Sequence, residues 1–313
     1  MRSDRRALII GIDEYKLLQK LDFPQNDAIS LFEILQSYNC QFSCDLMGVE
    51  AKASTIREKF KALFSDADEN ATLLFYFAGH AQTIHGGTYL ITCDAEEDVE
   101  SGVYFQRLID IVSNSRKPNQ SCIFILDCCR AGALPIEQAK IDFTSLQNIV
   151  SSSLGITLLA ATEEDKDAIE REDLQHGVFT YWLIEGLKGQ AANQNGDVTI
   201  SSLQEYLSDV MTKRSYKQRV VYKTTTVGAS PVLAKGYSPN THKALSLLSA
   251  DQLREVEVTS RDSIIRLQDK SRVDYNLWIT RGYMEVSNET SQLVSWRDEL
   301  RSKRVVVKEQ ITG

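Results

Sequence analysis

The sequence predicts an α/β fold, a three-layer sandwich in which helices flank a mostly parallel sheet of about six strands. The first observation is that short apolar, β-forming runs alternate with amphipathic helical segments between residues 7 and 235. The second is that reactive side chains directly follow two of these runs, at the strand ends where open α/β sheets carry their active sites. Right-handed crossovers between parallel strands limit the possible topologies.

The strands are expected at short runs of apolar and β-branched residues. They are Ala7–Ile12, Phe42–Gly48, Thr72–Ala78, Thr88–Thr92, Ser121–Asp127 and Gly155–Ala161. The helices are expected where apolar residues recur along one face. They are Asn26–Ser37, Ala53–Phe64, Tyr104–Asn114, Val178–Leu187 and a later helix from Ile200 to Met211. The stretch Ala131–Ser153 has little periodicity, so it is predicted to be a mobile or cleavable loop.

The length of 313 residues allows one large domain and a smaller one. The strand–helix alternation ends near Gly236, and Tyr237–Asn240 has the composition of a linker. We therefore expect a main domain over residues 1–236 and a C-terminal module of unassigned role over residues 237–313.

The composition favours a soluble, cytoplasmic protein. The formal net charge of −8 provides no basic excess, so nucleic acid is not an expected partner. No apolar run approaches the roughly 20 residues of a membrane span, and the run after Arg6 is too short for a signal-peptide core. The six cysteines and four histidines show no metal-ligand spacing, which favours free thiols in a reducing compartment.

His80 and Cys129 provide the strongest functional signal. His80 follows the apolar run Ala71–Gly79, and Cys129 ends a second such run 49 positions later. A thiol becomes a useful nucleophile at neutral pH when a base or a cation lies close to it. If the two runs form neighbouring parallel strands, His80 and Cys129 meet at the same edge of the sheet. We therefore expect Cys129 to be a nucleophile and His80 its base.

The sequence around these residues resembles the caspase-like cysteine peptidases (peptidase C14), above all their bacterial caspase and metacaspase branch. The caspase pattern places its His about 50 residues before its Cys. Other segments match in the same order, over roughly residues 5–235. They are Leu8–Tyr15, Pro24–Ala28, Tyr89–Asp94, Leu158–Thr162, His176–Thr180 and Gly196–Ser201. The resemblance implies a caspase-type fold, a Cys–His dyad and cleavage of peptide bonds in protein substrates.

The chain departs from the family pattern at a few positions. Ala81 follows the histidine where the family often has Gly. Cys128 precedes the nucleophile where Ser or Ala is common, and Arg130-Ala131 follows it in place of His-Ser. The family's Asp-x-Cys-x-x-Gly spacing favours Cys129 over Cys128 as nucleophile, and Cys128 would then point into the fold.

Other cysteines and histidines are weaker candidates. Cys122 and Cys93 suit the role of small buried apolar residues. His85 is a weaker competitor for the base, and His176 and His242 lack a comparable setting.

The backbone N–H groups of Ala81 and Cys129 are the expected oxyanion donors, because developing negative charge needs preorganised dipoles.

Asp27 and Asp127 bear on specificity. In metacaspase-like relatives, acidic residues at the matching positions line the S1 pocket and accept a basic P1 side chain. A guanidinium paired with two carboxylates gains charge-assisted hydrogen bonds. The structural alternatives are a carboxylate in the first turn of a helix for Asp27, and a strand-end carboxylate bonded to nearby amides for Asp127. The resemblance favours cleavage after Arg or Lys.

No cofactor is expected apart from a possible calcium requirement, which some metacaspases have. The acidic runs Asp94–Glu100 and Glu163–Asp167 offer hard carboxylates that suit calcium, but neither follows an EF-hand loop, so solvated surface loops explain them better. Arg130 and Lys140, near the predicted loop, are either self-processing sites or ordinary surface cations.

Three functions compete. The first is a regulated endopeptidase with a protein substrate and an activating partner, which the resemblance associates with bacterial cell death or antiphage defence. The second is a catalytically silent adaptor that recruits a partner through residues 237–313. The intact His80 and Cys129 argue against it. The third is an acyltransferase or another thiol hydrolase, which leaves the paired acids Asp27 and Asp127 unexplained.

Overall fold

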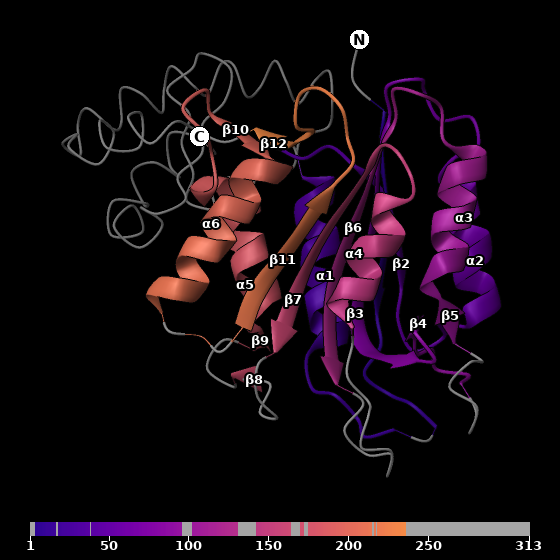
Figure 1. Cartoon of the computed structure of the whole chain (residues 1–313). Coiled ribbons are helices and arrows are strands. Elements are labelled where there is room, and N and C mark those ends of the chain that lie inside the picture. The colour runs from indigo at the N-terminus through magenta and orange to yellow at the C-terminus, as the bar shows by residue number, and fades with distance from the viewer. Residues whose placement is uncertain are drawn as a thin grey trace, which may run out of the picture. The chain divides into compact units, whose positions relative to one another are not determined.

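A computed structural model of the chain is shown in Figure 1. It describes residues 4–16, 18–37, 39–95, 102–130, 142–163, 170–171, 175–214, 216 and 218–235. The described residues form two compact units. The larger unit draws them from 4–36, 42–184 and 207–231, and the smaller from 37–41, 185–206 and 232–235. The expected module over 237–313 lies outside the described residues, so the boundary at residue 236 stays a prediction.

The larger unit is built on an eight-stranded sheet, counted over its described residues. Six strands follow one another in the order β11-β7-β6-β3-β1-β2. They are β1 (Arg5–Gly11), β2 (Ser43–Met47), β3 (Thr72–Ile84), β6 (Ser121–Arg130), β7 (Ile156–Glu163) and β11 (Gln218–Thr224). The pairs along this order are parallel except for β11, which runs antiparallel to β7. Two short antiparallel strands continue from β3, namely β4 (Gly87–Leu90) and β5 (Val103–Tyr104).

Helices lie on both sides of this sheet (Figure 1). They are α1 (Pro24–Gln36), α2 (Ala53–Ala62), α3 (Phe105–Ser115), α4 (Phe143–Ser151) and α5 (Val178–Glu185). A two-stranded ribbon of β8 (Glu170–Arg171) and β9 (His176–Gly177) precedes α5. The smaller unit contains a π-helical turn (Gly186–Gln190) and a ribbon of β10 (Asp197–Thr199) with β12 (Val232–Lys235). Helix α6 spans Ile200–Lys213.

The main core lies between the sheet and helices α2, α3 and α4. Alternate residues of β3 and β6 point into it, because successive side chains of a strand face opposite sides. The ring of Phe124 lies 5.6 Å from Phe60, 5.6 Å from Phe75 and 5.1 Å from Phe105, measured between centroids. The residues of β3 and β6 that lie between these point to the opposite face of the sheet, and they are buried too. Burial on both faces is typical of parallel strands in α/β folds.

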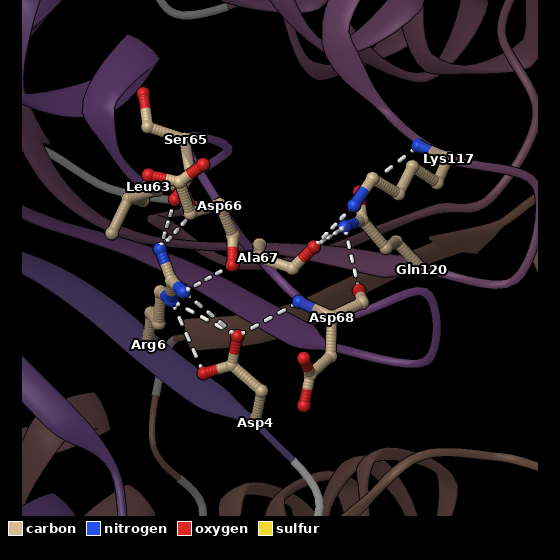
Figure 2. Close-up of polar contacts among 9 residues, drawn as sticks. All are labelled: Asp4, Arg6, Leu63, Ser65, Asp66, Ala67, Asp68, Lys117 and Gln120. Carbon is tan, nitrogen blue, oxygen red and sulfur yellow. Dashed lines mark hydrogen bonds and ion pairs between the residues drawn. The ribbon is translucent and has the colours of Figure 1, made fainter.

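A polar network fastens the loop after α2 to the start of the sheet (Figure 2). The Arg6 guanidinium pairs with Asp4 at 2.9 Å and donates to the Asp66 carbonyl at 3.0 Å. Lys117 Nζ donates to the Ala67 carbonyl at 2.6 Å, and Gln120 Nε2 to the Asp68 carbonyl at 2.8 Å. These contacts lie at the amino ends of β1, β3 and β6, opposite the ends that carry His80 and Cys129. They therefore stabilise the fold without entering the candidate site.

The predicted α/β sandwich is confirmed, and two of its strands are longer than expected. Strands β3 and β6 run on to Ile84 and Arg130, so His80 and Cys129 lie inside strands rather than just after them. The extension of β3 is stabilised by its antiparallel pairing with β4, in which Ala81 opposes Leu90. The apolar run in the sequence ends at Ala78, and the pairing with β4 that extends the strand leaves no apolar pattern.

The predicted loop over Ala131–Ser153 is wrong for its second part, because Phe143–Ser151 forms α4. The Asp142 carboxylate caps this helix by accepting the N–H groups of Thr144 at 2.9 Å and Ser145 at 3.2 Å. Only Leu146 and Val150 are fully buried, so the apolar repeat is too short to stand out in the sequence. Residues 131–141 lie outside the description.

Strand β11 was also absent from the expected elements. It sits at the edge of the sheet and is only partly buried, which leaves a weak apolar signal. Within the described ranges, no helix combines the length and the apolarity that a membrane span requires.

Candidate active site

His80 and Cys129 are direct neighbours across two strands. Strands β3 and β6 are parallel, and the register pairs His80 with Cys129 and Gly79 with Cys128. Neighbouring strands lie about 4.8 Å apart, so the two backbones are held side by side. The side chain of Cys129 is outside the description, and the register concerns its backbone alone.

The His80 ring is buried, with 2% exposure, and its tautomer follows from one contact. Nε2 lies 2.8 Å from the backbone carbonyl oxygen of Gln19. A carbonyl oxygen can only accept, so Nε2 carries the hydrogen. In the neutral ring Nδ1 is then the basic nitrogen, which makes it the atom able to take a proton from a thiol.

Tyr15 holds the backbone and the ring of His80. Its hydroxyl donates to the Ile12 carbonyl at 2.9 Å and accepts the backbone N–H of His80 at 2.8 Å. Its ring lies 4.7 Å from the imidazole, between centroids. Gly79 makes room for this contact, because a Cβ atom there would lie 2.4 Å from the tyrosine hydroxyl oxygen, and its φ of 151° also favours glycine.

We expect Gly79→Ala to lower kcat for peptide cleavage by about 10²-fold, because it displaces Tyr15 and with it His80. The measurement is steady-state kinetics, accompanied by thermal unfolding to show that the fold survives. Gly48→Ala is the matched control, since an added Cβ meets only the flexible Gln25 side chain at 3.1 Å. Unchanged kcat in Gly79→Ala would show that the Tyr15 contact does not position the histidine.

The two expected oxyanion donors lie within the ladder between β3 and β6. The register pairs His80 with Cys129 and Ala81 with Arg130. An oxyanion donor must point at the substrate. The role of the Ala81 and Cys129 amides stays a prediction.

Asp27 lies in the first turn of α1 and is buried, with 2% exposure. Its Oδ1 lies 2.7 Å from Nδ1 of His176, and its Oδ2 accepts the backbone N–H of Gly177 at 3.2 Å. Burial raises the pKa of Asp27, while the hydrogen bond and the charge of His176 oppose that shift. The neighbouring charge of Asp13 adds to the rise.

Asp127, on β6, is hydrogen-bonded to Thr180 in the first turn of α5. Its Oδ2 accepts the Thr180 hydroxyl at 2.6 Å, and the carboxylate also bonds the Thr180 backbone N–H. The Thr180 oxygen in turn lies 2.7 Å from the Tyr76 hydroxyl, which must be the donor because the threonine hydrogen is already used. Burial raises the pKa of Asp127 to about 7, and the charge of Asp27 adds to that rise.

The two acids converge on one glycine. A Cβ atom at Gly177 would lie 3.0 Å from Oδ2 of Asp27 and 3.2 Å from Oδ2 of Asp127. Two carboxylates that share a buried site repel each other, and a bound cation would relieve both the repulsion and the cost of burial. The structure thus brings together both acids that the resemblance assigned to S1. It also shows the amide contact that was the structural alternative for Asp127.

Several site residues were not predicted as such. Tyr15, His176 and Thr180 lie in segments that match the family, but the sequence predicts no role for Tyr15 or Thr180 and favours His80 over His176 as the base. The signal available for Tyr15 and Thr180 was their place in those matching segments. Gln19 acts through its backbone carbonyl, which any residue type could supply, so no sequence signal exists for it.

The other candidates fall elsewhere. Cys128 is buried in the core with the residues that face α2, α3 and α4, as expected for a side chain that points into the fold. Cys122 is fully buried, and burial raises its pKa, which suits an inert thiol. His85 lies in the turn between β3 and β4. His242 and Lys140 lie outside the described residues, and the Arg130 side chain is not described.

Within the described part of the chain, no group of three or more His, Cys, Asp or Glu side chains is arranged to hold a metal ion. Asp94, at the start of the first acidic run, uses Oδ1 to accept the Thr92 hydroxyl at 2.7 Å and the Ala53 N–H at 3.2 Å. These bonds give Asp94 a structural role. Residues 96–100 and 164–167 of the two runs lie outside the description.

The sheet order, the flanking helices and the His80–Cys129 register define a caspase-type α/β sandwich. The chain belongs to the caspase family (peptidase C14), whose caspase domain matches residues 4–229. The family that the sequence resembles is thereby confirmed.

A paracaspase from Dictyostelium discoideum is 27% identical over 220 residues, which cover 68% of this chain and 50% of the relative. The chain thus spans about half the length of that relative.

Solved structures show the same fold. The Drosophila initiator caspase Dronc superposes with a TM-score of 0.55 at 11% identity, covering 75% of this chain and 84% of Dronc. Protein GSU0716 from Geobacter sulfurreducens gives 0.54 at 12% identity, covering 75% of this chain and 98% of that protein. At such low identities the likeness concerns the fold alone.

Proposed function

We propose that the protein is a cysteine endopeptidase that uses His80 and Cys129 as its catalytic dyad and cleaves after Arg or Lys. The observation that carries this proposal is the register of β3 and β6, which places the two residues side by side. The Gln19 carbonyl supports the proposal because it holds the hydrogen of His80 on Nε2 and so leaves Nδ1 as the basic nitrogen.

In the proposed mechanism, Nδ1 of His80 takes the proton of the Cys129 thiol, and the thiolate attacks the scissile carbonyl carbon. A C–S bond forms and the carbonyl oxygen becomes an oxyanion. As the C–N bond breaks, the imidazolium returns its proton to the leaving amine. A water molecule, deprotonated by His80, then hydrolyses the thioester and releases the acid product. The Gln19 carbonyl stabilises the imidazolium in both halves of the reaction.

The proposed preference for a basic P1 side chain rests on Asp27 and Asp127. Both are buried, their carboxylates flank Gly177, and burial raises the pKa of each. A guanidinium or ammonium group would supply the positive charge that this arrangement lacks. An anionic P1 side chain would add a third negative charge to the same site.

The proposal is tested with fluorogenic peptides that differ only at P1, carrying Arg, Lys, Gln or Asp. We expect kcat/KM for Arg and Lys to exceed that for Gln by about 10²-fold, the worth of one or two charge-assisted hydrogen bonds. Assays with calcium and with a chelator test a calcium requirement in the same series. A preference for Asp at P1 would refute the assignment of Asp27 and Asp127.

We also propose a cytoplasmic setting, a protein substrate and activation by a signal or a protein partner, with bacterial defence or cell death as the context. The support for this setting is the family resemblance. Among the described side chains the cysteines form no disulfide, which suits a reducing compartment.

A further inference from the structure

We propose that His176 is a specificity-determining residue that caps the S1 pocket: its imidazole occupies the place of a P1 cation beside Asp27, and a basic P1 side chain must displace it. This inference rests on the proposed Arg/Lys function and adds a residue to that site. His176 would thus set how strongly the enzyme binds basic substrates.

The hydrogen bonds of Asp27 show that His176 occupies its carboxylate. Its Oδ1 meets Nδ1 of His176 at 2.7 Å, and its Oδ2 accepts the Gly177 N–H at 3.2 Å. Both oxygens are therefore engaged by two consecutive residues. The Asp27 side chain is 3% exposed and that of His176 is 18% exposed. The imidazole is thus the more exposed partner of this pair.

The imidazole of His176 offers Asp27 the same kind of hydrogen-bond donor as a basic P1 side chain. The carboxylate can only accept, so Nδ1 of His176 donates its N–H to Asp27. A guanidinium or ammonium group would offer the same kind of N–H donor to the same oxygen. His176 and a basic P1 side chain therefore compete for one position.

His176 lies on a short ribbon outside the main sheet. Strand β9 pairs only with the two-residue β8 in the described structure, in a ribbon separate from the main sheet, and short ribbons are marginal on their own. Gln175, just before it, has a φ of 54°, a strained left-handed conformation for a residue other than glycine. The backbone on either side of His176 is bonded to α1, because Asn26 Nδ2 donates to the Gln175 carbonyl at 2.6 Å and the Gly177 N–H donates to Asp27 at 3.2 Å. The displacement that we propose is therefore a rotation of the His176 side chain, which needs no change in β3 or β6.

The alternative is that His176 only orients Asp27, and the two roles predict opposite effects. A cap lowers the fraction of protein that is competent to bind a cation, so its removal tightens binding. An orienting residue improves the geometry of Asp27, so its removal weakens binding. Asn at position 176 keeps a neutral N–H donor at nearly the place of Nδ1, which separates loss of the contact from loss of the ring.

The experiment uses the full chain with His176→Ala and His176→Asn. Substrates with P1 Arg and P1 Gln give KM and kcat, and calorimetric titration with benzamidine, a small P1-like cation, measures binding without catalysis. We expect His176→Ala to lower KM for the Arg peptide about tenfold with little change in kcat, and to tighten benzamidine binding similarly. KM for the Gln peptide should not fall. Asn at position 176 should lie near wild type, and His85→Ala, in the β3–β4 turn, is the control.

A rise in KM and weaker benzamidine binding in His176→Ala, with recovery in His176→Asn, would overturn the cap. Failure of the underlying function has a different signature. If no variant cleaves any peptide but His176→Ala still binds benzamidine more tightly, the cap stands and the peptidase assignment fails. If benzamidine binds neither wild type nor His176→Ala, the basic S1 pocket and the cap both fail.

Discussion

Cys129→Ala is expected to abolish cleavage of Arg- and Lys-containing peptides, with a fall in kcat/KM of about 10⁴-fold or more. In the proposed mechanism the thiolate at position 129 forms the covalent bond to the substrate, and alanine offers no nucleophile in its place. The measurement is kcat/KM on the fluorogenic Arg peptide, with circular dichroism and thermal unfolding to confirm that the fold is retained.

Cys128→Ala is the matched control, because it removes the adjacent thiol. Cys128 packs in the core with 7% exposure, so its loss should cost about 1–2 kcal/mol of stability and leave kcat nearly unchanged. If Cys128→Ala were inactive and Cys129→Ala active, the nucleophile would be Cys128 and the dyad drawn from the register would be wrong.

Asp127→Asn is expected to weaken basic P1 recognition while stabilising the protein at alkaline pH. The substitution keeps the shape and the hydrogen bonds to Thr180 but removes the charge. We expect KM for the Arg peptide to rise about 10–100-fold, which corresponds to one charge-assisted hydrogen bond, while turnover of the Gln peptide changes little. Asp45→Asn, at an exposed carboxylate paired only loosely with Lys59 at 3.4 Å, is the control.

The stability effect follows from the raised pKa of Asp127. The folded-state pKa is about 7, against an ordinary value of 3.8, so the native protein holds a proton that the unfolded chain releases above about pH 4. Wild-type stability from this group is therefore fully present below pH 4 and is lost as the pH rises through 7. Asp127→Asn lacks this loss, so its advantage over wild type should grow by about 3 kcal/mol between pH 5 and pH 8. Denaturant unfolding at both pH values measures it, and a pH-independent difference would contradict the buried, raised pKa.

The fold was predictable because its elements repeat simple patterns. The buried runs of β3 and β6 and the apolar face of α1 are visible in the sequence, and each of these elements begins within about two residues of its expected start. The strand ends were not predictable, because the extension of β3 depends on pairing with β4. Helix α4 was not predicted because only Leu146 and Val150 mark its buried face.

The candidate site was predictable where chemistry requires a particular residue type. His80, Cys129 and the two acids are of that kind. The contacts that organise them are tertiary. Tyr15 reaches His80 across 65 positions, and His176 reaches Asp27 across 149. Contacts between residues so far apart in the sequence leave no local pattern from which they could be predicted.

We propose that this chain cleaves proteins after basic residues with Cys129 as nucleophile. The most direct test is a cleavage profile on a proteome-derived peptide library, with and without calcium, using Cys129→Ala as the blank. We expect new peptide termini almost entirely after Arg or Lys, and we expect them to be absent from the Cys129→Ala sample. Cleavage after Asp, or identical profiles for wild type and Cys129→Ala, would contradict it.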